Sequence, residues 1–471
     1  MCKSKVIALA IAMASVLPGR VQAQDSAVLD EIRREIRQMK ESYEARIQAL
    51  EQRLTEAQAA AASAQASAVK AESTAQKAEA SAGQAPAPAP TTTSANAFNP
   101  GISLILNGSY QYYGENPANV GITGYVPAGE RPIGPRGFSL GESELTFSAA
   151  VDHLFYGQAT FAVEQGQGET SLGVEEAFVQ TPALGHGLTL KAGQFFSSLG
   201  YANSIHAHAW DFFDSALPQS TFLGNNLAVT GLQANWIAPL PVFVELGVEG
   251  DNPVGFPFPD SSSSSNGIPS YTLFARVGGD IGASSSYRVG AWWLQSQNDV
   301  DGTPFLDFGN SYTFQGGDTK LWGLDFIYKW APEGNPTQRN FKLQAEWMQR
   351  RIEGDLTFDD TVNPAATGSI RAKQDGWYVQ GVYQFIPQWR AGLRYDRLSN
   401  GSFNVSNALV GLVPTYDYAP YRWSTMLDWS ASEFSRIRLQ YNYDKTQQNL
   451  TNNEVFLQYI MSLGTHGAHK F

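Results

Sequence analysis

Apolar and polar side chains alternate strictly along residues 137–165, GFSLGESELTFSAAVDHLFYGQATFAVEQ. Leu145 and Phe147 fall on one face of the first run, whereas Glu144 and Thr146 fall on the other. A period of two residues is typical of a β-strand that buries one face. The alternation resumes after a very short turn, so the pattern predicts a β-hairpin with one apolar and one polar face.

Such runs recur about sixteen times between residues 102 and 464, each about ten residues long with an aromatic-rich apolar face. Only 16% of the residues are charged, and 12% are aromatic. After the first 20 residues no window approaches the apolar run of a membrane-spanning helix. A closed barrel is the other structure that satisfies every backbone hydrogen bond in lipid. The repetition therefore predicts a transmembrane β-barrel.

The links between these runs alternate in length. Links after even-numbered runs are short, as near residues 153 and 387, whereas those after odd-numbered runs are mostly long, as at 114–137, 197–225 and 399–419. Outer-membrane barrels have short periplasmic turns and longer external loops. The alternation therefore fits a barrel whose two ends lie on the periplasmic side.

The sequence before the barrel predicts an exported chain with a helical extension. Residues 1–23 combine two lysines, an apolar core and a small-residue cleavage site, which indicates a signal peptide. Heptad-spaced apolar residues within 24–84 predict a periplasmic coiled coil that continues as an Ala-rich helix, and a Pro/Thr-rich linker follows at 85–97. A single amphipathic helix lying on another surface is the alternative. With the barrel at 98–471, the predicted fold class is an all-β transmembrane barrel of about 16 antiparallel strands preceded by an N-terminal α-helical coiled coil.

Strand parity separates charged side chains that face the barrel interior from those that face lipid. The basic side chains assigned to the interior are Arg390, Arg394, Arg422, Arg436, Arg438 and Lys191. The acidic ones are Glu142, Glu144, Glu164 and one of the pair Glu175 and Glu176, taken as Glu176. We expect an acidic wall and a basic wall with a transverse field between them that orients dipolar solutes. Polar positions that tune nothing specific are the alternative.

Three segments resemble the phosphate-selective porin O and P family of Gram-negative outer membranes. They are LGESELTFSAAVDHLFYGQATFAVE, VEEAFVQTPALGHGLTLKAGQFF and the C-terminal LQYIMSLGTHGAHKF. The similarity covers roughly residues 100–471. It implies a homotrimer of sixteen-stranded barrels in outer-membrane lipid and lipopolysaccharide, each a water-filled pore narrowed by loops folded inward.

The external link at residues 197–225 stands where general porins fold a loop into the lumen, and it contains HAHAWDFFDSALPQSTF. We expect His206, His208, Asp211 and Asp214 to lie in or near the constriction. Two histidines followed by two carboxylates also form a constellation that suits zinc. Four polar residues in an aromatic loop are more often structural, so we assign neither a metal nor a cofactor, and a metal-binding channel is kept as an alternative.

The resemblance implies an outer-membrane porin for passive diffusion of small hydrophilic solutes or ions, with anions as candidates. Of 32 Lys and Arg and 44 Asp and Glu, 11 and 10 precede residue 97, which leaves 21 basic and 34 acidic groups in the barrel region. No run of lysines accompanies the arginines. Selectivity for phosphate is therefore not predicted, although the family name contains it.

Two other classes of function are weighed. The helical extension could reach about 90 Å, enough to approach peptidoglycan, which suggests an envelope tether. A barrel-rim enzyme could recruit His206, His208 and Asp211, but no serine motif accompanies them. We expect no enzyme activity and no nucleic-acid partner, and we expect the barrel in the outer membrane with its extension in the periplasm.

Overall fold

The computed structural model describes the barrel and much of its loops. No helix in the part of the chain that it describes is long and apolar enough to span a membrane. The signal peptide 1–23, the helical extension 24–84 and the linker 85–97 lie outside the described residues. The residues described are 100–117, 120–125, 136–165, 170–182, 184–254, 267–297, 312–359 and 365–464.

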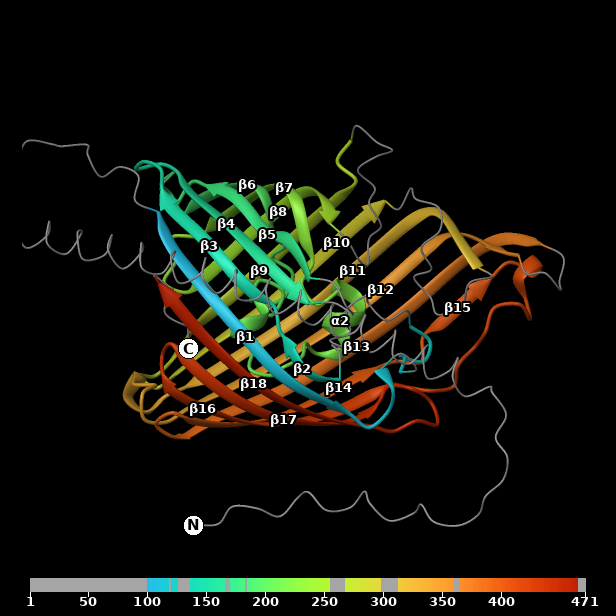
Figure 1. Cartoon of the computed structure of the whole chain (residues 1–471). Helices are drawn as coiled ribbons and strands as arrows, with labels where there is room; N and C mark the ends of the chain where they lie inside the picture. The colour runs from blue at the N-terminus through green and yellow to red at the C-terminus, as the bar shows by residue number, and fades with distance from the viewer. Residues whose placement is uncertain are drawn as a thin grey trace, which may run out of the picture. The chain divides into compact units, whose positions relative to one another are not determined.

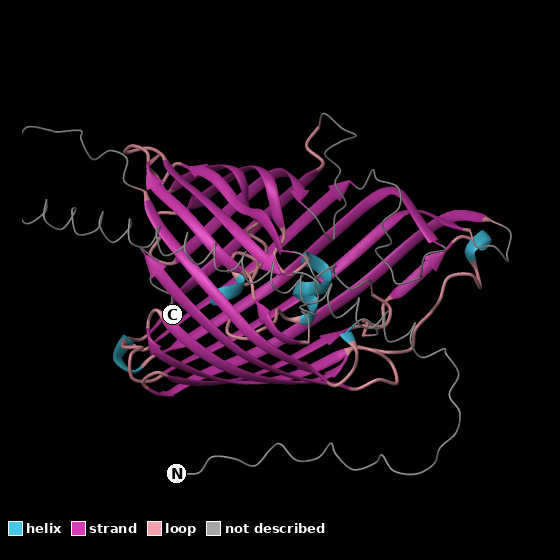
Figure 2. Ribbon diagram, viewed as in Figure 1, coloured by secondary structure: helices cyan, strands magenta, loops and turns pink. Residues whose placement is uncertain are grey.

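Eighteen strands among the described residues form one antiparallel sheet (Figures 1 and 2). They are β1 (Gly101–Tyr113), β2 (Gly137–Leu140), β3 (Ser143–Ala150), β4 (Tyr156–Gln165), β5 (Thr170–Gln180), β6 (Leu188–Phe196), β7 (Ala228–Ile237), β8 (Phe243–Val254), β9 (Ser270–Ile281), β10 (Ser285–Gln297), β11 (Tyr312–Trp330), β12 (Asn340–Phe358), β13 (Ala366–Ile386), β14 (Trp389–Leu398), β15 (Ser402–Val405), β16 (Tyr421–Ser432), β17 (Ser435–Lys445) and β18 (Asn452–Gly464).

The sheet closes into a barrel because β1 pairs with β18, Ser103 lying opposite Gly464. β2 and β3 lie end to end along β1, and β14 and β15 lie end to end along β13. Within the described residues this leaves sixteen strands that cross the barrel. The prediction of an antiparallel barrel of about 16 strands is confirmed.

Side chains alternate between an apolar outer face and a polar interior. On β17, Ile437 and Leu439 are exposed, whereas Arg438 and Gln440 are buried. This inverts the pattern of a soluble sheet, in which the charged side chains face outward. An outer face of this kind is stable against lipid, and the polar interior suits a water-filled lumen.

Aromatic side chains form two belts on the outer face. Trp389 and Trp429 lie opposite each other near the short turns, with ring centroids 6.4 Å apart. Tyr395 and Trp423 form the other belt, with centroids 4.5 Å apart, and the exposed Leu393 lies between the belts. The two belts are about 20 Å apart along β14, and because the strands of such barrels are tilted, this spans less than the roughly 25 Å height of a typical apolar band.

The connections alternate in length as the sequence predicts. Residues 387–388 join β13 to β14, and residues 433–434 join β16 to β17, whereas 114–136, 197–227 and 255–269 are long links. Successive strands that cross the barrel run in opposite directions. The long links therefore all lie at the same end of the barrel, which is the end opposite to the first residue of β1. The alternation of short turns and long loops is confirmed.

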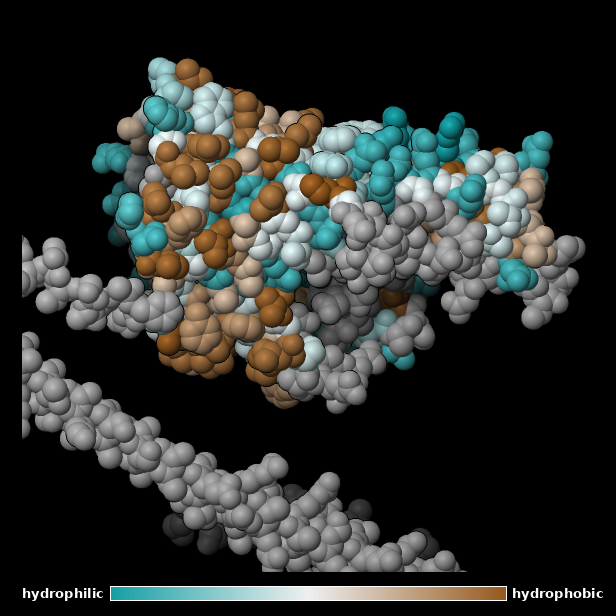
Figure 3. All heavy atoms as spheres, turned by 90° about the horizontal axis from the view of Figure 1, so that it is seen from above, coloured by the Kyte–Doolittle hydropathy of each residue, from teal (hydrophilic) through white to brown (hydrophobic). Residues whose placement is uncertain are grey.

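The strands β11, β12 and β13 are longer than predicted, at 19, 19 and 21 residues, so the links predicted at 298–317, before β11, and at 352–369, after β12, are too long. In their outer parts the polarity of the two faces reverses. Arg351 and Glu353 are exposed, whereas Ile352 and Leu356 are buried in an apolar cluster with Leu409. Figure 3 shows hydrophilic residues over the arm at the right, where Figure 1 places the ends of these strands. This part of the sheet therefore lies beyond the lipid and has its own apolar core.

Candidate functional site

Residues 197–227, between β6 and β7, enter the barrel and are called the inner loop here. Asn203 fixes the neck of this loop. Its side-chain amide donates to the carbonyl oxygen of Ser197 at 2.8 Å and its oxygen accepts from the backbone N–H of Leu227 at 2.7 Å. The side chain of Asn226 donates to the carbonyl oxygen of Asn203 at 2.6 Å. These bonds hold the two ends of the inner loop together, so that the residues between them form a compact unit.

The helix α2 (Leu217–Leu223) anchors the inner loop by apolar contacts with β12, β13 and β14. All seven of its residues are buried. Pro218 suits the first turn of the helix, and Gly224 ends it in the left-handed conformation. The ring of Phe222 lies 6.1 Å from that of Tyr125 and 5.1 Å from the guanidinium carbon of Arg350. This half of the inner loop is therefore held as a small apolar core.

Five arginines on β14, β16 and β17 form what we call the basic sector. They are Arg390, Arg394, Arg422, Arg436 and Arg438. The inner loop contacts this sector through Asp211 and Asp214, so the sequence-predicted arginines and aspartates meet.

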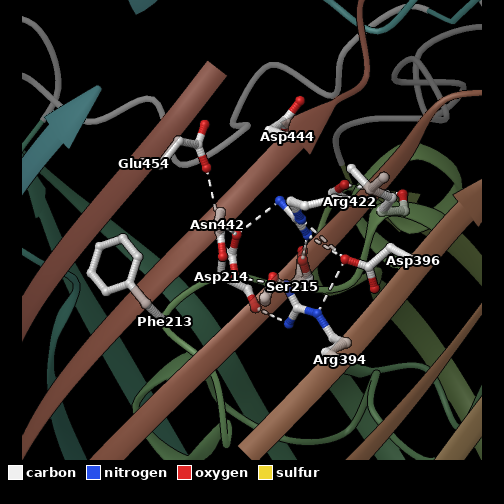
Figure 4. A network of polar contacts seen from close by, with 12 residues as sticks. Phe213, Asp214, Ser215, Arg394, Asp396, Arg422, Asn442, Asp444 and Glu454 are labelled. Atoms are coloured by element: carbon white, nitrogen blue, oxygen red, sulfur yellow. Dashed lines mark hydrogen bonds and ion pairs between the residues drawn. The ribbon is translucent and has the colours of Figure 1, made fainter. Parts of the chain in front are cut away.

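Asp214 of the inner loop pairs with two arginines of the barrel (Figure 4). Its Oδ1 lies 2.7 Å from Arg394 Nη2, and its Oδ2 lies 2.8 Å from Arg422 Nη1. Asp396 Oδ2 lies 3.1 Å from Arg394 Nε and 3.0 Å from Arg422 Nη2. Burial would raise the pKa of Asp214, but the charges of Arg422 and Arg394 outweigh it and hold that pKa well below its usual range. This pairing fixes the inner loop at a buried, charge-balanced point.

Asp211 makes the second contact with the basic sector. Its Oδ2 lies 2.5 Å from Lys342 Nζ on β12, and its Oδ1 lies 3.4 Å from Arg390 Nη1. Arg390 also pairs with Asp428, whose Oδ1 lies 2.9 Å from Arg438 Nε. Burial would raise the pKa of Asp211, but Lys342 and Arg390 keep it below its usual range. Asp211, Asp214 and Asp396 are thus each shared between two cations, and Asp428 is shared among three, since Arg436 Nη1 lies 4.0 Å from its Oδ2.

Glu144 of β3 and the pair Glu175 and Glu176 of β5 form the acidic sector, which meets the histidines of the inner loop. His206 Nδ1 lies 3.1 Å from Glu144 Oε2 and 3.0 Å from Glu175 Oε2. His206 Nε2 lies 3.0 Å from Glu176 Oε2, and His208 Nδ1 lies 2.5 Å from Glu144 Oε1. Burial would lower the pKa of His206, but the three carboxylates outweigh it and hold that pKa well above its ordinary value.

A β-bulge turns both glutamates of β5 toward the interior. Thr160 lies opposite Glu176 and Phe161 lies opposite Val174, so Glu175 is the extra residue of the bulge. Strict parity assigned only one of the two glutamates to the interior. The bulge breaks the parity at this point, and both carboxylates reach His206.

Of the other charges predicted to face the interior, two lie near the acidic sector and the side chain of one lies outside the described residues. Lys191 Nζ lies 4.5 Å from the ring centroid of Phe178, so it makes a cation–π contact. Glu142 lies between β2 and β3, with a carboxylate oxygen within 4.8 Å of one of Glu144. The side chain of Glu164 lies outside the described residues.

Closure of the barrel places the acidic and basic sectors near each other, separated by β18 and β1. The inner loop bridges them. The ring of His208 contacts Glu144, and its carbonyl oxygen accepts from Arg436 Nη2 at 2.5 Å. Between the sectors, Phe213 stacks on Phe456 of β18 with ring centroids 4.4 Å apart. The predicted transverse field between two open walls is therefore wrong in this respect. Histidines of the inner loop cover the acidic sector, and aspartates of the inner loop cover the basic sector.

The inner loop separates the four polar residues that suggested a zinc constellation. His206 and His208 contact the acidic sector, whereas Asp211 and Asp214 contact the basic sector. A site that combines these two histidines with these two aspartates is not formed. A metal ion bound by these histidines would take its further protein ligands from the glutamates of the barrel.

Solved barrels of other bacteria resemble the fold only distantly. An anion-selective porin from Comamonas acidovorans gives a TM-score of 0.46 at 10% identity, over 78% of this chain and 99% of that chain. The outer membrane channel DcaP of Acinetobacter baumannii gives 0.44 at 13% identity, over 78% of this chain and 97% of that chain. Likeness of this degree carries no conclusion about what this chain conducts.

The sequence comparisons are more specific. Residues 295–409 match the family described as phosphate-selective porin O and P. An uncharacterized protein of Aquifex aeolicus is 32% identical over 407 residues, covering 80% of this chain and 81% of the relative. The chain belongs to the phosphate-selective porin O and P family. The predicted membership of the family is confirmed, by residues other than the three segments that suggested it, and this porin is an outer-membrane barrel with channel function.

Three groups of this porin site were missed in the sequence, and the first is Asp428, which shares the parity of Arg422 on β16. Lys342 shares the parity of the buried Gln344 and Glu346, so the alternation along β12 could have assigned it to the interior. Gln440 donates to Asp214 Oδ1 at 2.7 Å, and parity with Arg438 would have found it. Their partners in the inner loop had no comparable signal, because no local rule links a loop to a strand so distant in the sequence.

We expect the contribution of Asp214 to the stability of the porin to survive mild acid. Because its pKa is lowered in the folded chain, the pairing is fully present above the unfolded pKa of about 3.9 and is lost only as the pH falls toward the lower folded value. The difference in melting temperature between the wild type and Asp214→Asn should therefore stay constant from about pH 7 to pH 4.5 and shrink at more acidic pH. A difference that shrinks between pH 7 and pH 5 would contradict the lowered pKa.

Proposed function

We propose that the chain forms a water-filled channel through which small hydrophilic solutes and ions diffuse passively, with the inner loop as its constriction. The observation that supports this proposal is that the inner loop is attached to the wall inside a polar barrel. His206 and His208 meet the acidic sector, and Asp211 and Asp214 meet the basic sector. A loop fixed at both places narrows the lumen and lines the remaining opening with polar side chains, which is how a pore selects among solutes.

The proposed preference is a weak one for anions. In the pairs that hold the inner loop, the cation is the more exposed partner. The side chain of Arg390 is 23% exposed against 4% for Asp211, and that of Lys342 is 16% exposed against 4% for the same aspartate. His206 is likewise 19% exposed against 2% for Glu144. Solutes in the lumen would therefore meet cations first, although the barrel region as a whole holds more acidic than basic groups.

Reversal potentials in a potassium chloride gradient test this proposal. We expect the wild type to be more permeable to chloride than to potassium, because Arg390 and Arg436 lie partly exposed in the lumen. The double variant Arg390→Gln, Arg436→Gln should lower the ratio of anion to cation permeability. Arg371→Gln is the matched control, since Arg371 lies exposed on the outer part of β13 and should leave the ratio unchanged.

Two outcomes would contradict the proposed selectivity. A preference of the wild type for potassium would remove the anion preference. Saturable block of the chloride current by phosphate would indicate a phosphate-binding site, which the shared and mostly buried ion pairs of the basic sector do not suggest. Absence of any conductance from the folded barrel would remove the channel itself.

The remaining parts of the proposal concern the assembly. We propose a homotrimer in outer-membrane lipid and lipopolysaccharide, without a catalytic step, and with residues 24–84 in the periplasm near peptidoglycan. The mass of the detergent-solubilised complex tests the trimer. Cosedimentation of the full chain with peptidoglycan, against a variant with a scrambled heptad pattern, tests the tether, and incubation with peptide and ester substrates tests for hydrolysis.

A further inference from the structure

Two histidines and four carboxylates converge where the inner loop meets the acidic sector. They are Glu142, Glu144, Glu175, Glu176, His206 and His208. The residues come from the junction of β2 and β3, from the bulge in β5 and from the inner loop around the short 3₁₀ helix η3 (Ala207–Ala209). Three separate parts of the chain therefore bring metal-ligating side chains to one place.

The ligand atoms of Glu144, His206 and His208 all lie within 4.8 Å of one another. The carboxylate oxygens of Glu142, Glu144 and Glu175 form a second such group. Glu144 is common to both groups, so the two groups adjoin each other at this residue. Two imidazole nitrogens and a carboxylate oxygen are a ligand set that zinc and similar divalent ions accept.

The charge balance of the cluster favours an added cation. Four carboxylates face two imidazoles and the neighbouring ammonium of Lys191, so with all four carboxylates ionised the cluster keeps a net negative charge even when both histidines are protonated. The side chains of Glu144, Glu175 and Glu176 are only 2%, 13% and 10% exposed. Because a buried carboxylate without a compensating charge is costly, a divalent ion at this point would stabilise the cluster.

We propose that His206, His208 and Glu144 bind a divalent transition-metal ion of the zinc class, with Glu175 as the adjacent carboxylate available as a further ligand. This goes beyond the channel function, since the basic sector alone could hold a constriction. Metal binding would join the inner loop to β3 through the two histidines. It would thereby stabilise the docked inner loop by an amount that rises with the logarithm of the free metal concentration above the dissociation constant.

Zinc titration of the purified full-length protein in detergent, after removal of metal with a chelator, tests this site by calorimetry. We expect one zinc ion per chain at this site and weaker binding by more than about tenfold in the double variant His206→Ala, His208→Ala. The matched control is His153→Ala, His186→Ala, which removes two exposed histidines from short turns and should leave the affinity unchanged.

A second variant keeps the test decisive if the histidine variant folds poorly. Glu144→Gln preserves the shape of the side chain but removes a charged ligand, so it should also weaken zinc binding while the barrel keeps its folded mobility on a gel. Cobalt added in place of zinc should give a visible absorption band in the wild type that is lost in both variants. Equal zinc affinity in the wild type and a folded variant would overturn the site. Such a result would leave the channel proposal unaffected, because conductance is measured separately.

Discussion

Replacing Asp214 with alanine should release the inner loop from the basic sector and increase the single-channel conductance. The substitution leaves Arg394 and Arg422 buried with Asp396 as the carboxylate between them. Loss of one partner from a buried ion pair costs about 3–5 kcal/mol, because the remaining charge stays out of water. That cost is avoided if the segment around Asp214 leaves the sector and admits water, which widens the lumen at this point.

Single-channel recordings in planar bilayers measure the conductance, and thermal melting of the detergent-solubilised barrel measures the stability. Glu353→Ala is the matched control. It breaks an ion pair with Arg371 in which the atoms lie 3.8 Å apart and both side chains are exposed, and such pairs contribute little. Neither conductance nor stability should change in the control. A destabilised Asp214→Ala barrel with unchanged conductance would show that the inner loop does not form the constriction.

The release should be partial, because the two halves of the inner loop are held by different forces. Asp211 and Asp214 are attached through charge, whereas α2 is attached through buried apolar contacts of residues such as Leu217 and Phe222. Strong acid protonates the carboxylates of the charged half and affects the apolar half far less, whereas salt screens these buried pairs only weakly. An increase in conductance with retained protection of α2 from protease would be the signature of this division.

The barrel itself was predictable because lipid and water act on alternate residues of every strand. Leu439 faces lipid and Arg438 faces the interior, and this requirement repeats along the chain with a period of two. Parity therefore sorts most interior side chains without knowledge of their neighbours. It fails where the ladder is irregular, as at Glu175, because an extra residue changes the phase of the strand.

The outer parts of β11, β12 and β13 escaped prediction for a different reason. Their alternation continues, but Ile352 and Leu356 turn inward and Arg351 and Glu353 turn outward. Beyond the lipid, water covers the outer face and the apolar side chains pack inside. If lipid is assumed to cover the outer face throughout, this exchange of apolar and polar positions between the two faces looks like the end of a strand.

The contacts of the inner loop could not be read from the sequence at all. Asp214 lies 180 positions before Arg394, and His206 lies 62 positions after Glu144. Only closure of the barrel and entry of the loop into the lumen bring these pairs together. The sequence did supply the complementary charges, and it was right to single out the histidines and aspartates, but it could not assign their partners.

Gly193 should tolerate no side chain, and its replacement should strongly impair folding. Its φ is 127°, and an added Cβ would collide with the carbonyl oxygen of Ala177 and lie 2.8 Å from the Cα of Phe178. Both obstacles are backbone atoms of β5, so a rotamer change cannot relieve them. The unfavourable conformation alone costs on the order of 1–3 kcal/mol for a residue with a side chain, and separation of the strands adds to it.

The measurement is the folded fraction of Gly193→Ala after refolding into detergent, scored by the gel mobility of the unheated protein and by urea unfolding. Gly173→Ala on β5 is the matched control, because an added Cβ there meets nothing within 4 Å. We expect the control to fold as the wild type does and Gly193→Ala to lose most of the folded form. Equal folding of the two variants would mean that β5 and β6 can shift their register. Such a shift would leave the bulge between β4 and β5 in place, so Glu175 and Glu176 would still face the interior.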